Sequence, residues 1–272
     1  MRLMNYQDWI GRTEETPDLL SPAPLRGMAA LLDLDTTPVE LPPLWHWLYF
    51  LPSHPQRTLG ADGHAERGGF LPPVALPRRM WAGGRVQWLA RLSEGEAITR
   101  KSTVLSVEQK SGRSGELVFV TVQHEISNDR GTAIIEQHDL VYRGLATSSP
   151  AGTPPTLDAQ WQREIRPDPT LLFRYSALTF NTHRIHYDQP YVTQVEGYPG
   201  LVVHGPLIAT LLVEAMPAAL RARMTHFSFR ALRPLFDTAA FTVAGRLDGN
   251  TAHLWAIDST GMLCMQASAT LT

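Results

Sequence analysis

The most constraining feature of this 272-residue chain is a series of strand-type segments with no helix between them, and this series occurs twice. In each series, stretches of alternating apolar and polar residues are separated by short turns. The stretches are residues 97–110, 115–127 and 132–143 in the first series, and 226–236, 240–247 and 252–271 in the second. The sequences DGN at 248–250 and STG at 259–261 are typical of hairpins. Strands that follow one another in this way indicate an α+β fold rather than an α/β fold.

An apolar helix that begins at a proline is predicted before each series. Residues 21–33 (SPAPLRGMAALLD) resemble residues 203–215 (VHGPLIATLLVEA) in this respect. The repeated order predicts a tandem duplication of two antiparallel sheets, each wrapped around a central helix. A Ser-, Thr-, Pro- and Gly-rich stretch without periodicity separates the two copies. We therefore predict an N-terminal domain of residues 1–145, a linker of residues 146–160 and a C-terminal domain of residues 161–272.

Composition narrows the class of protein. With 43% hydrophobic and 18% charged residues, the chain is typical of soluble globular proteins. A net charge of −2 gives no electrostatic footprint for nucleic acid. The single cysteine, Cys264, excludes an intramolecular disulfide and a cysteine-based metal cluster, and its alternating surroundings predict a buried strand residue. No stretch reaches membrane-spanning length, so we expect a cytoplasmic protein with no membrane partner.

Titratable residues concentrate between Leu178 and Leu212, beside one of the most apolar helices in the chain. Asp188 is predicted to be the N-cap of a short helix. Gly205 and Pro206 open a second helix, which is apolar on every face and should therefore be buried. Three histidines flank these helix starts: His183, His186 and His204.

The free backbone N–H groups at a helix start stabilise negative charge, and a glycine there allows a ligand to come close. A histidine titrates near neutral pH and can accept or donate a proton. A histidine base beside such donors is what enolate or tetrahedral oxyanion chemistry requires.

Other interpretations of these histidines stay open. Each of them could merely satisfy buried backbone groups. His183 and His186 could also ligate a metal, but no third ligand stands at zinc spacing, so no metal is predicted. The chain has no G-x-S-x-G elbow, which disfavours a serine nucleophile.

The sequence FNTHRIHYDQPYV, followed by GLVVHGPL, resembles the MaoC-like (R)-specific enoyl-thioester hydratases, which carry a D-x-N-P-[LIV]-H-x-D motif and a later H-G helix start. The resemblance implies a double hot-dog fold. Ile185, His186 and Asp188 match the I-H-x-D part of the motif, and His204 with Gly205 match the helix start. The resemblance implies that His186 activates water and that the Gly205 amide binds the thioester oxygen.

The chain departs from the motif where the family has its catalytic aspartate. Asn181 stands at that position, and His183 and Arg184 replace the family's Asn and Pro. An amide cannot accept a proton as a carboxylate does. Either Asn181 orients water, substrate or His186, or another acid takes over. Asp188 is the candidate acid, with helix capping as its alternative role.

The segments GHAERGGFLPP and PRRMWAGG add a resemblance to one sub-branch: itaconyl-CoA and mesaconyl-C4-CoA hydratases together with mitochondrial-type 3-hydroxyacyl-thioester dehydratases. It implies reversible hydration of an α,β-unsaturated acyl-CoA, with a C5 dicarboxylyl-CoA and citramalyl-CoA as the expected pair. Arg78, Arg79 and Arg184 are predicted to hold the free carboxylate, since guanidinium binds carboxylate bidentately. Their alternative partners are surface acids or the CoA phosphates.

Coenzyme A is expected only as part of the substrate, with no separate cofactor. The alternatives are a 3-hydroxyacyl-thioester dehydratase of fatty-acid metabolism, a hot-dog acyl-CoA thioesterase and a non-catalytic acyl-thioester binding module. Because the first copy lacks the NTHRIH signature, we expect one active site per chain, with the first copy shaping the acyl pocket and binding part of CoA. The two copies are expected to pair through their sheet edges, and a homodimer is a further possibility.

Overall fold

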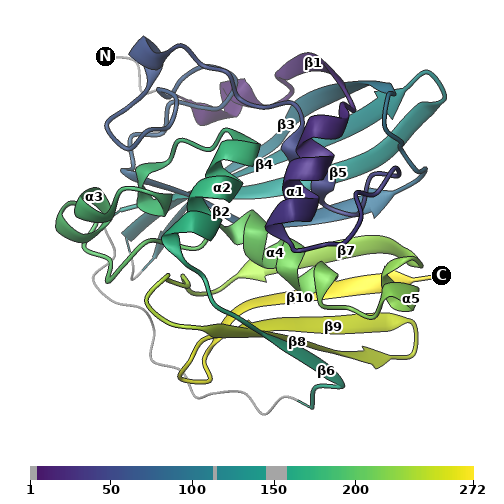
Figure 1. Cartoon of the computed structure of the whole chain (residues 1–272). Coiled ribbons are helices and arrows are strands. Elements are labelled where there is room, and N and C mark those ends of the chain that lie inside the picture. The colour runs from purple at the N-terminus through teal and green to yellow at the C-terminus, as the bar shows by residue number, and fades with distance from the viewer. Residues whose placement is uncertain (1–4, 113–114, 145–157) are drawn as a thin grey trace.

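The computed structural model describes residues 5–112, 115–144 and 158–272. Its strands form one antiparallel sheet in the order β1-β3-β4-β5-β2-β7-β10-β9-β8-β6 (Figure 1). The first half contributes β1 (Thr13–Leu19), β2 (Arg78–Trp88), β3 (Ala97–Gly112), β4 (Gly115–Asn128) and β5 (Gly131–Arg143). The second contributes β6 (Trp161–Ile165), β7 (Met224–Ala231), β8 (Phe241–Asp248), β9 (Thr251–Ile257) and β10 (Leu263–Leu271).

The two halves repeat one topology, which confirms the predicted duplication and the α+β double hot-dog fold. The order β1-β3-β4-β5-β2 is matched by β6-β8-β9-β10-β7. The halves meet where β2 pairs antiparallel with β7, so the two expected sheets are joined into one. Gly83 and Gly84 lie at this seam, and a Cβ on either would press against the backbone of a neighbouring strand. The seam therefore requires glycine at these two positions.

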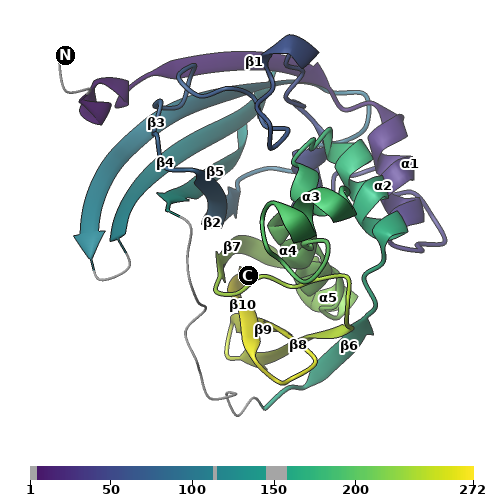
Figure 2. The ribbon, with the colours of Figure 1, turned by 90° about the vertical axis from the view of Figure 1, so that its left-hand side faces the viewer.

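The central helix of the second half is α4 (Gly205–Glu214), which packs against β8, β9 and β10. Seven of its ten residues are buried, in agreement with its apolar sequence. The remaining helices are α2 (Pro169–Thr179), α3 (Gln189–Gln194) and α5 (Ala218–Arg221), with 3-10 turns η1 (Tyr6–Trp9), η2 (Trp45–Leu48), η3 (Gln56–Thr58) and η4 (Arg184–His186). Figure 2 shows that α1 (Pro22–Leu31), α2, α3 and α4 gather on the concave side of the sheet.

The helix predicted at residues 21–33 forms as α1 (Pro22–Leu31), but its equivalence to α4 was wrong. It follows β1 directly, as α2 follows β6, so α1 corresponds to α2. The two helices pack together so closely that a Cβ on Gly27 would overlap the side chain of Leu178. At the place in chain order where α4 lies in the second half, the first half has the short turn η2. The concave face of the first half is thereby left free for a cavity.

Most predicted strands are confirmed, and Cys264 is buried in β10 as expected. Three strands were not predicted: β2, which contains the segment RRMWAGG, and the polar edge strands β1 and β6. The predicted linker lies outside the described residues except for 158–160.

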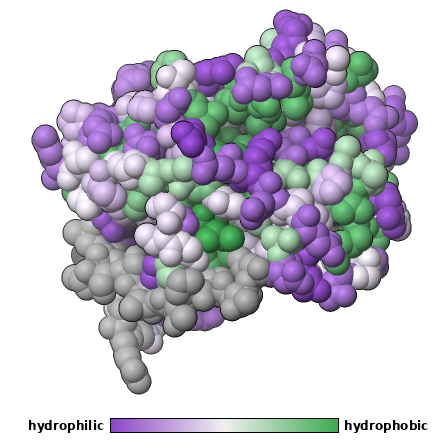
Figure 3. All heavy atoms as spheres, turned by 60° about the horizontal axis from the view of Figure 1, so that its bottom comes forward, coloured by the Kyte–Doolittle hydropathy of each residue, from purple (hydrophilic) through white to green (hydrophobic). Residues whose placement is uncertain are grey.

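No helix in the described part of the chain is long and apolar enough to cross a membrane. The face of the molecule in Figure 3 intermixes hydrophilic and hydrophobic side chains.

Candidate functional site

His186 lies in η4 and is 7% exposed. Its Nδ1 lies 2.7 Å from the carbonyl oxygen of Val202, to which it can only donate a proton. This fixes the tautomer, and Nε2 keeps its lone pair and has no hydrogen-bond partner among the described residues. Burial lowers the pKa of His186 to about 4, because the charged form loses its hydration, although the bond to Val202 opposes the shift. At neutral pH the ring is therefore an uncharged base.

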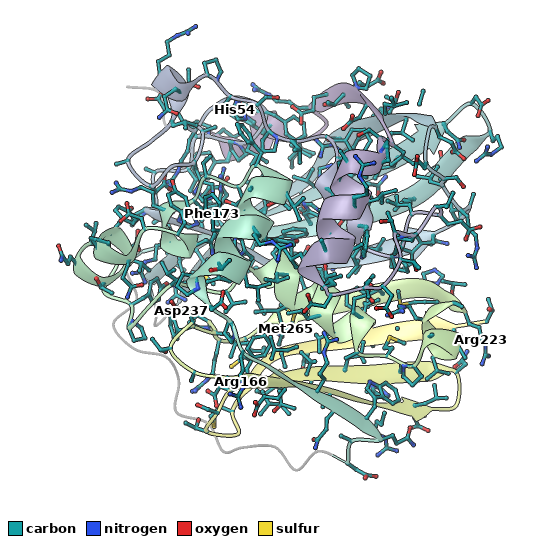
Figure 4. The ribbon with its side chains drawn as sticks, in the orientation of Figure 1. His54, Arg166, Phe173, Arg223, Asp237 and Met265 are labelled. Carbon is teal, nitrogen blue, oxygen red and sulfur yellow. The ribbon has the colours of Figure 1, made fainter. Side chains whose placement is uncertain are left out.

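The Val202 carbonyl is held in place by the segment that precedes α4. Asp237, labelled in Figure 4, accepts a hydrogen bond from the Leu201 amide at 2.8 Å and donates its own amide to the Leu201 carbonyl. The Val203 amide donates to Leu235, and the Val202 amide donates back to Ile185 beside His186. These backbone contacts fix the distance between η4 and the start of α4.

Four imidazoles form a continuous row: His64, His183, His186 and His204. The ring centroids of successive members are 4.0, 5.4 and 3.7 Å apart. Burial lowers the pKa of every member, that of His183 to about 2, so the row is uncharged at neutral pH. When one ring gains a proton, no other ring in the row therefore carries a positive charge that would repel it.

His204 forms the buried end of this row. It is 0% exposed, stacks on His186 and has its Nε2 2.9 Å from the Ser176 hydroxyl. It does not line the cavity described below. The prediction that His204 contacts substrate is therefore not supported, and its position is that of a platform for His186.

His64 comes from the first half of the chain and forms the other end of the row. Its Nδ1 lies 3.1 Å from Asp62 Oδ2, and this pairing holds Asp62 as a carboxylate with a lowered pKa. The loop reaches the second half through Gly63, at φ +87°, where a Cβ would overlap the Thr182 carbonyl. Sequence analysis did not select Asp62 or His64, although both lie in or next to the segment GHAERGGFLPP. Its compact Asp-Gly-His sequence was the available signal.

Gly205 is the first residue of α4, and a Cβ on it would meet no atom within 4 Å. Its N–H has no acceptor in the described part of the chain, and Pro206 after it has no N–H. Gly205 lines the same cavity as His186. The predicted juxtaposition of a base and a helix N-terminus is thus present.

A cavity of about 590 Å³ lies between the two halves. Its walls come from the concave face of β2–β5, the segment around η2, the end of α2 and the residues from Asn181 to Pro206. A second cavity of about 1340 Å³ shares Gly205, Val202, Val203 and Trp81 with it. We call the smaller one the inner cavity and the larger one the outer cavity; Gly205 lines both. The outer cavity also carries several arginines: Arg78, Arg85, Arg143, Arg230 and Arg233.

Within the inner cavity, a group of charged and polar side chains interrupts the apolar wall. We call it the polar floor; it consists of His46, Arg100, His124, Glu136 and His138. None of these residues was selected from the sequence, because strand periodicity shows only which face they share.

Two predicted residues line the inner cavity in addition to His186 and Gly205: Asn181 and Arg79. The Asn181 Oδ1 accepts the His183 amide at 3.0 Å, and no hydrogen bond links Asn181 to His186 in the described structure. The proposal that Asn181 holds His186 was therefore wrong, since the Val202 carbonyl does so. Arg79 has no carboxylate within ion-pairing distance among the described residues, and its charge acts on His64 and His183.

Three other predicted residues serve structural contacts outside the inner cavity. Asp188 caps α3 through the Tyr191 amide at 3.0 Å and binds Arg184 at 2.8 and 2.9 Å, which is the capping role considered as its alternative. Arg184 also donates to the Ala61 carbonyl, and Arg78 pairs with Glu196 at 3.3 Å. Neither arginine lines the inner cavity. These side chains were already occupied by neighbours that only the tertiary structure supplies.

Asp62, His64 and His183 bring three potential ligand atoms within 4.8 Å of one another. Three protein ligands with an open position are typical of a catalytic zinc site. The group differs from the His183–His186 pair considered from the sequence. His64 is already paired with Asp62, which satisfies both side chains without an ion.

The chain is similar to several known proteins. Residues 44–237 match the family described as hydroxyacyl-thioester dehydratase type 2. The chain is 45% identical to mesaconyl-C(4)-CoA hydratase of Chloroflexus aurantiacus, over 100% of this chain and 99% of that protein. It is 29% identical to the mitochondrial hydroxyacyl-thioester dehydratase type 2 of Schizosaccharomyces pombe, over 88% of this chain and 90% of that protein.

Among solved structures, a MaoC-like dehydratase from Phytophthora capsici superposes with a TM-score of 0.73. It covers 99% of this chain and 98% of its own, at 15% sequence identity. This likeness supports the fold.

Proposed function

The chain belongs to the hydroxyacyl-thioester dehydratase type 2 family, a family of hydro-lyases, and from this premise we propose that it hydrates mesaconyl-C4-CoA to citramalyl-CoA, reversibly. The observation that carries the proposal is the shared cavity of the uncharged base His186 and the open helix start at Gly205. The relative at 45% identity supports the choice of acyl group.

In the first step, His186 Nε2 takes a proton from water while the water oxygen bonds to the β-carbon of the enoyl thioester. The electron pair of the double bond moves to the thioester oxygen, which becomes an enolate oxygen. The Gly205 N–H and the N-terminus of α4 stabilise this charge. One such donor contributes roughly 3–4 kcal/mol to transition-state stabilisation.

In the second step, the protonated His186 returns a proton to the α-carbon as the enolate collapses to the thioester. The net change is the addition of one water. While His186 carries the extra proton, the negative charge at the other end of the histidine row is the Asp62 carboxylate, which is paired with His64. His64 and His183 lie between Asp62 and His186. A positioned acid–base group contributes about 10²–10⁴-fold to the rate.

Because Gly205 lines both cavities, we infer one orientation for the bound substrate. The acyl group occupies the inner cavity beyond Gly205, and the coenzyme A part occupies the larger outer cavity. There Arg143 and Arg230 have no ion pair with any described residue, whereas Arg78 and Arg85 are paired with Glu196 and Asp139. Guanidinium groups suit the phosphates of coenzyme A. We propose that coenzyme A enters only as part of the substrate and that the first half of the chain shapes the acyl pocket.

Dehydration of fatty 3-hydroxyacyl thioesters is the second candidate, supported by the Schizosaccharomyces relative. The polar floor disfavours it, because burying polar groups against an alkyl chain costs free energy. Activity on itaconyl-CoA, a homodimer and a cytoplasmic location stay predictions.

The direct test is to incubate the purified protein separately with mesaconyl-C4-CoA, itaconyl-CoA and crotonyl-CoA, and to follow added water and free CoA by mass spectrometry. We expect water to add mainly to mesaconyl-C4-CoA. Preferred hydration of crotonyl-CoA would favour the fatty-acyl candidate, and free CoA without hydration would identify a thioesterase. His186→Ala should lose at least 10²-fold in kcat, while His226→Ala, at an exposed histidine of β7, should not.

A further inference from the structure

The polar floor lies in the middle of a face that is otherwise apolar. Along β4 the buried residues alternate as Val118, Val120, Val122, His124 and Ile126. On the neighbouring strand β5, Glu136 takes a place on the same face and is 2% exposed. A valine at either position would satisfy the sheet. Burying polar groups costs free energy unless they are paired. The fold alone therefore does not explain why polar residues stand at these positions.

Glu136 is fully engaged by its protein neighbours. Its Oε2 lies 3.0 Å from His46 Nε2, and its Oε1 accepts the Trp47 Nε1 proton at 2.7 Å. His138 Nε2 lies 2.8 Å from the same Oε1. Despite burial, the two histidines hold the pKa of Glu136 well below its usual range. Both oxygens of the carboxylate are therefore in contact with protein donors.

Arg100, in contrast, has no such partners. No hydrogen bond or ion pair reaches its guanidinium from any described residue, and its Nε is buried without an acceptor. Glu14, Asp18 and Glu136 act on it electrostatically, but none lies within 4.0 Å. Its guanidinium stands 5.1 Å from the centre of the Phe50 ring, and the residue lines the inner cavity. A partly buried guanidinium therefore lines the inner cavity without an ion pair to any described carboxylate.

We propose that Arg100 binds the free carboxylate of a dicarboxylyl thioester in the inner cavity. This rests on the proposed hydration reaction and names the residue that selects its substrate. Guanidinium and carboxylate form charge-assisted bidentate bonds, which are strong in a site of low polarity. Arg79, in the same cavity, adds a second positive charge near the histidine row.

The test compares mesaconyl-C4-CoA with crotonyl-CoA, whose β-carbon carries a methyl group but no carboxylate. In Arg100→Met, the ratio of kcat/KM for mesaconyl-C4-CoA over that for crotonyl-CoA should fall about 10- to 100-fold. Arg100→Lys keeps the positive charge but loses the planar pair of N–H donors of the guanidinium, so it should give an intermediate ratio. The matched control is Arg91→Met, at an exposed arginine paired with Glu40, which should keep the wild-type ratio. A ratio within twofold of wild type in Arg100→Met overturns the proposal.

Two further measurements keep the outcome decisive. If Arg100→Met does not fold, the double variant Arg100→Met/Glu136→Gln, which removes one charge of each sign, replaces it. If the wild-type protein hydrates none of the thioesters, the proposed reaction fails, and the carboxylate site is read from calorimetric binding of free mesaconate. Binding that weakens about 10-fold or more in Arg100→Met supports the site; equal binding, or none to wild type, overturns it.

Discussion

His186 donates its Nδ1 proton to the Val202 carbonyl over 2.7 Å, and this contact decides which ring nitrogen can act as the base. Val202 belongs to the segment that leads into α4, and Gly205 begins that helix three residues later. The same short segment therefore orients His186, the proposed base, and presents the Gly205 N–H, the proposed oxyanion donor. A displacement of this segment would disturb both functions at once.

The pH profile of kcat/KM should reflect the buried state of His186. The base acts in its uncharged form, and its pKa is lowered to about 4. The rate constant should therefore stay level from neutral pH down to about pH 5 and fall below about pH 4. Steady-state rates measured in pH-jump assays test this. A half-maximal rate near pH 6.5 would indicate a base exposed to water.

Stability should also fall on acidification. The unfolded His186 takes up a proton near pH 6.5, whereas the folded residue takes one up only near pH 4. Between these values the unfolded state binds more protons, so the free energy of unfolding decreases as the pH falls. Urea unfolding at several pH values measures the slope. The slope should be smaller in His186→Gln, and an unchanged slope in that variant would contradict the assignment.

Gly205→Ala should remove activity without harming the fold. A Cβ at this position meets no protein atom, but it would occupy space beside the Gly205 N–H where the thioester oxygen is expected. We expect a loss of roughly 10²–10³-fold in kcat and an unchanged Tm. Gly69→Ala is the control, because a Cβ there also meets nothing within 4 Å and Gly69 does not line either cavity. Full activity in Gly205→Ala would remove this glycine from the site.

Asp188→Ala should reduce stability and leave catalysis within about threefold of wild type, since Asp188 caps α3 and pairs with Arg184. The loss should appear as a lower Tm and a lower urea midpoint, because the cap of α3 is removed. Asp168→Ala offers a matched control, because Asp168 caps α2 through the Leu171 amide. A drop of 10²-fold or more in kcat for Asp188→Ala alone would restore the catalytic role considered from the sequence.

Chelation should leave turnover unchanged. Asp62 and His64 already satisfy each other, so the group formed with His183 needs no ion to be stable. Activity is to be measured after dialysis against EDTA, with metal content determined by mass spectrometry. Loss of activity that returns on adding zinc would instead make Asp62, His64 and His183 a metal site.

The sequence by itself determined the elements that depend on local pattern. Alternating residues placed seven of the strands, β3–β5 and β7–β10, and the apolar run from Gly205 placed α4. The resemblance to the I-H-x-D motif predicted His186 as the base. The strands and the helix follow from side-chain periodicity and from capping chemistry, which act within a few residues of one another. The duplication was visible for the same reason, because each copy repeats its own local pattern.

Only the tertiary structure decided which polar groups share a cavity. Asp62 and His64 reach His183 across more than a hundred residues, and Gly63 alone permits that approach. Arg184 and Asp188, which stood beside the motif in sequence, are bound to each other, while Arg100 from a distant strand faces the cavity. Strand periodicity shows that such residues point to one face, but pairing between distant strands and loops decides whether a charge meets a protein partner or is left for a ligand.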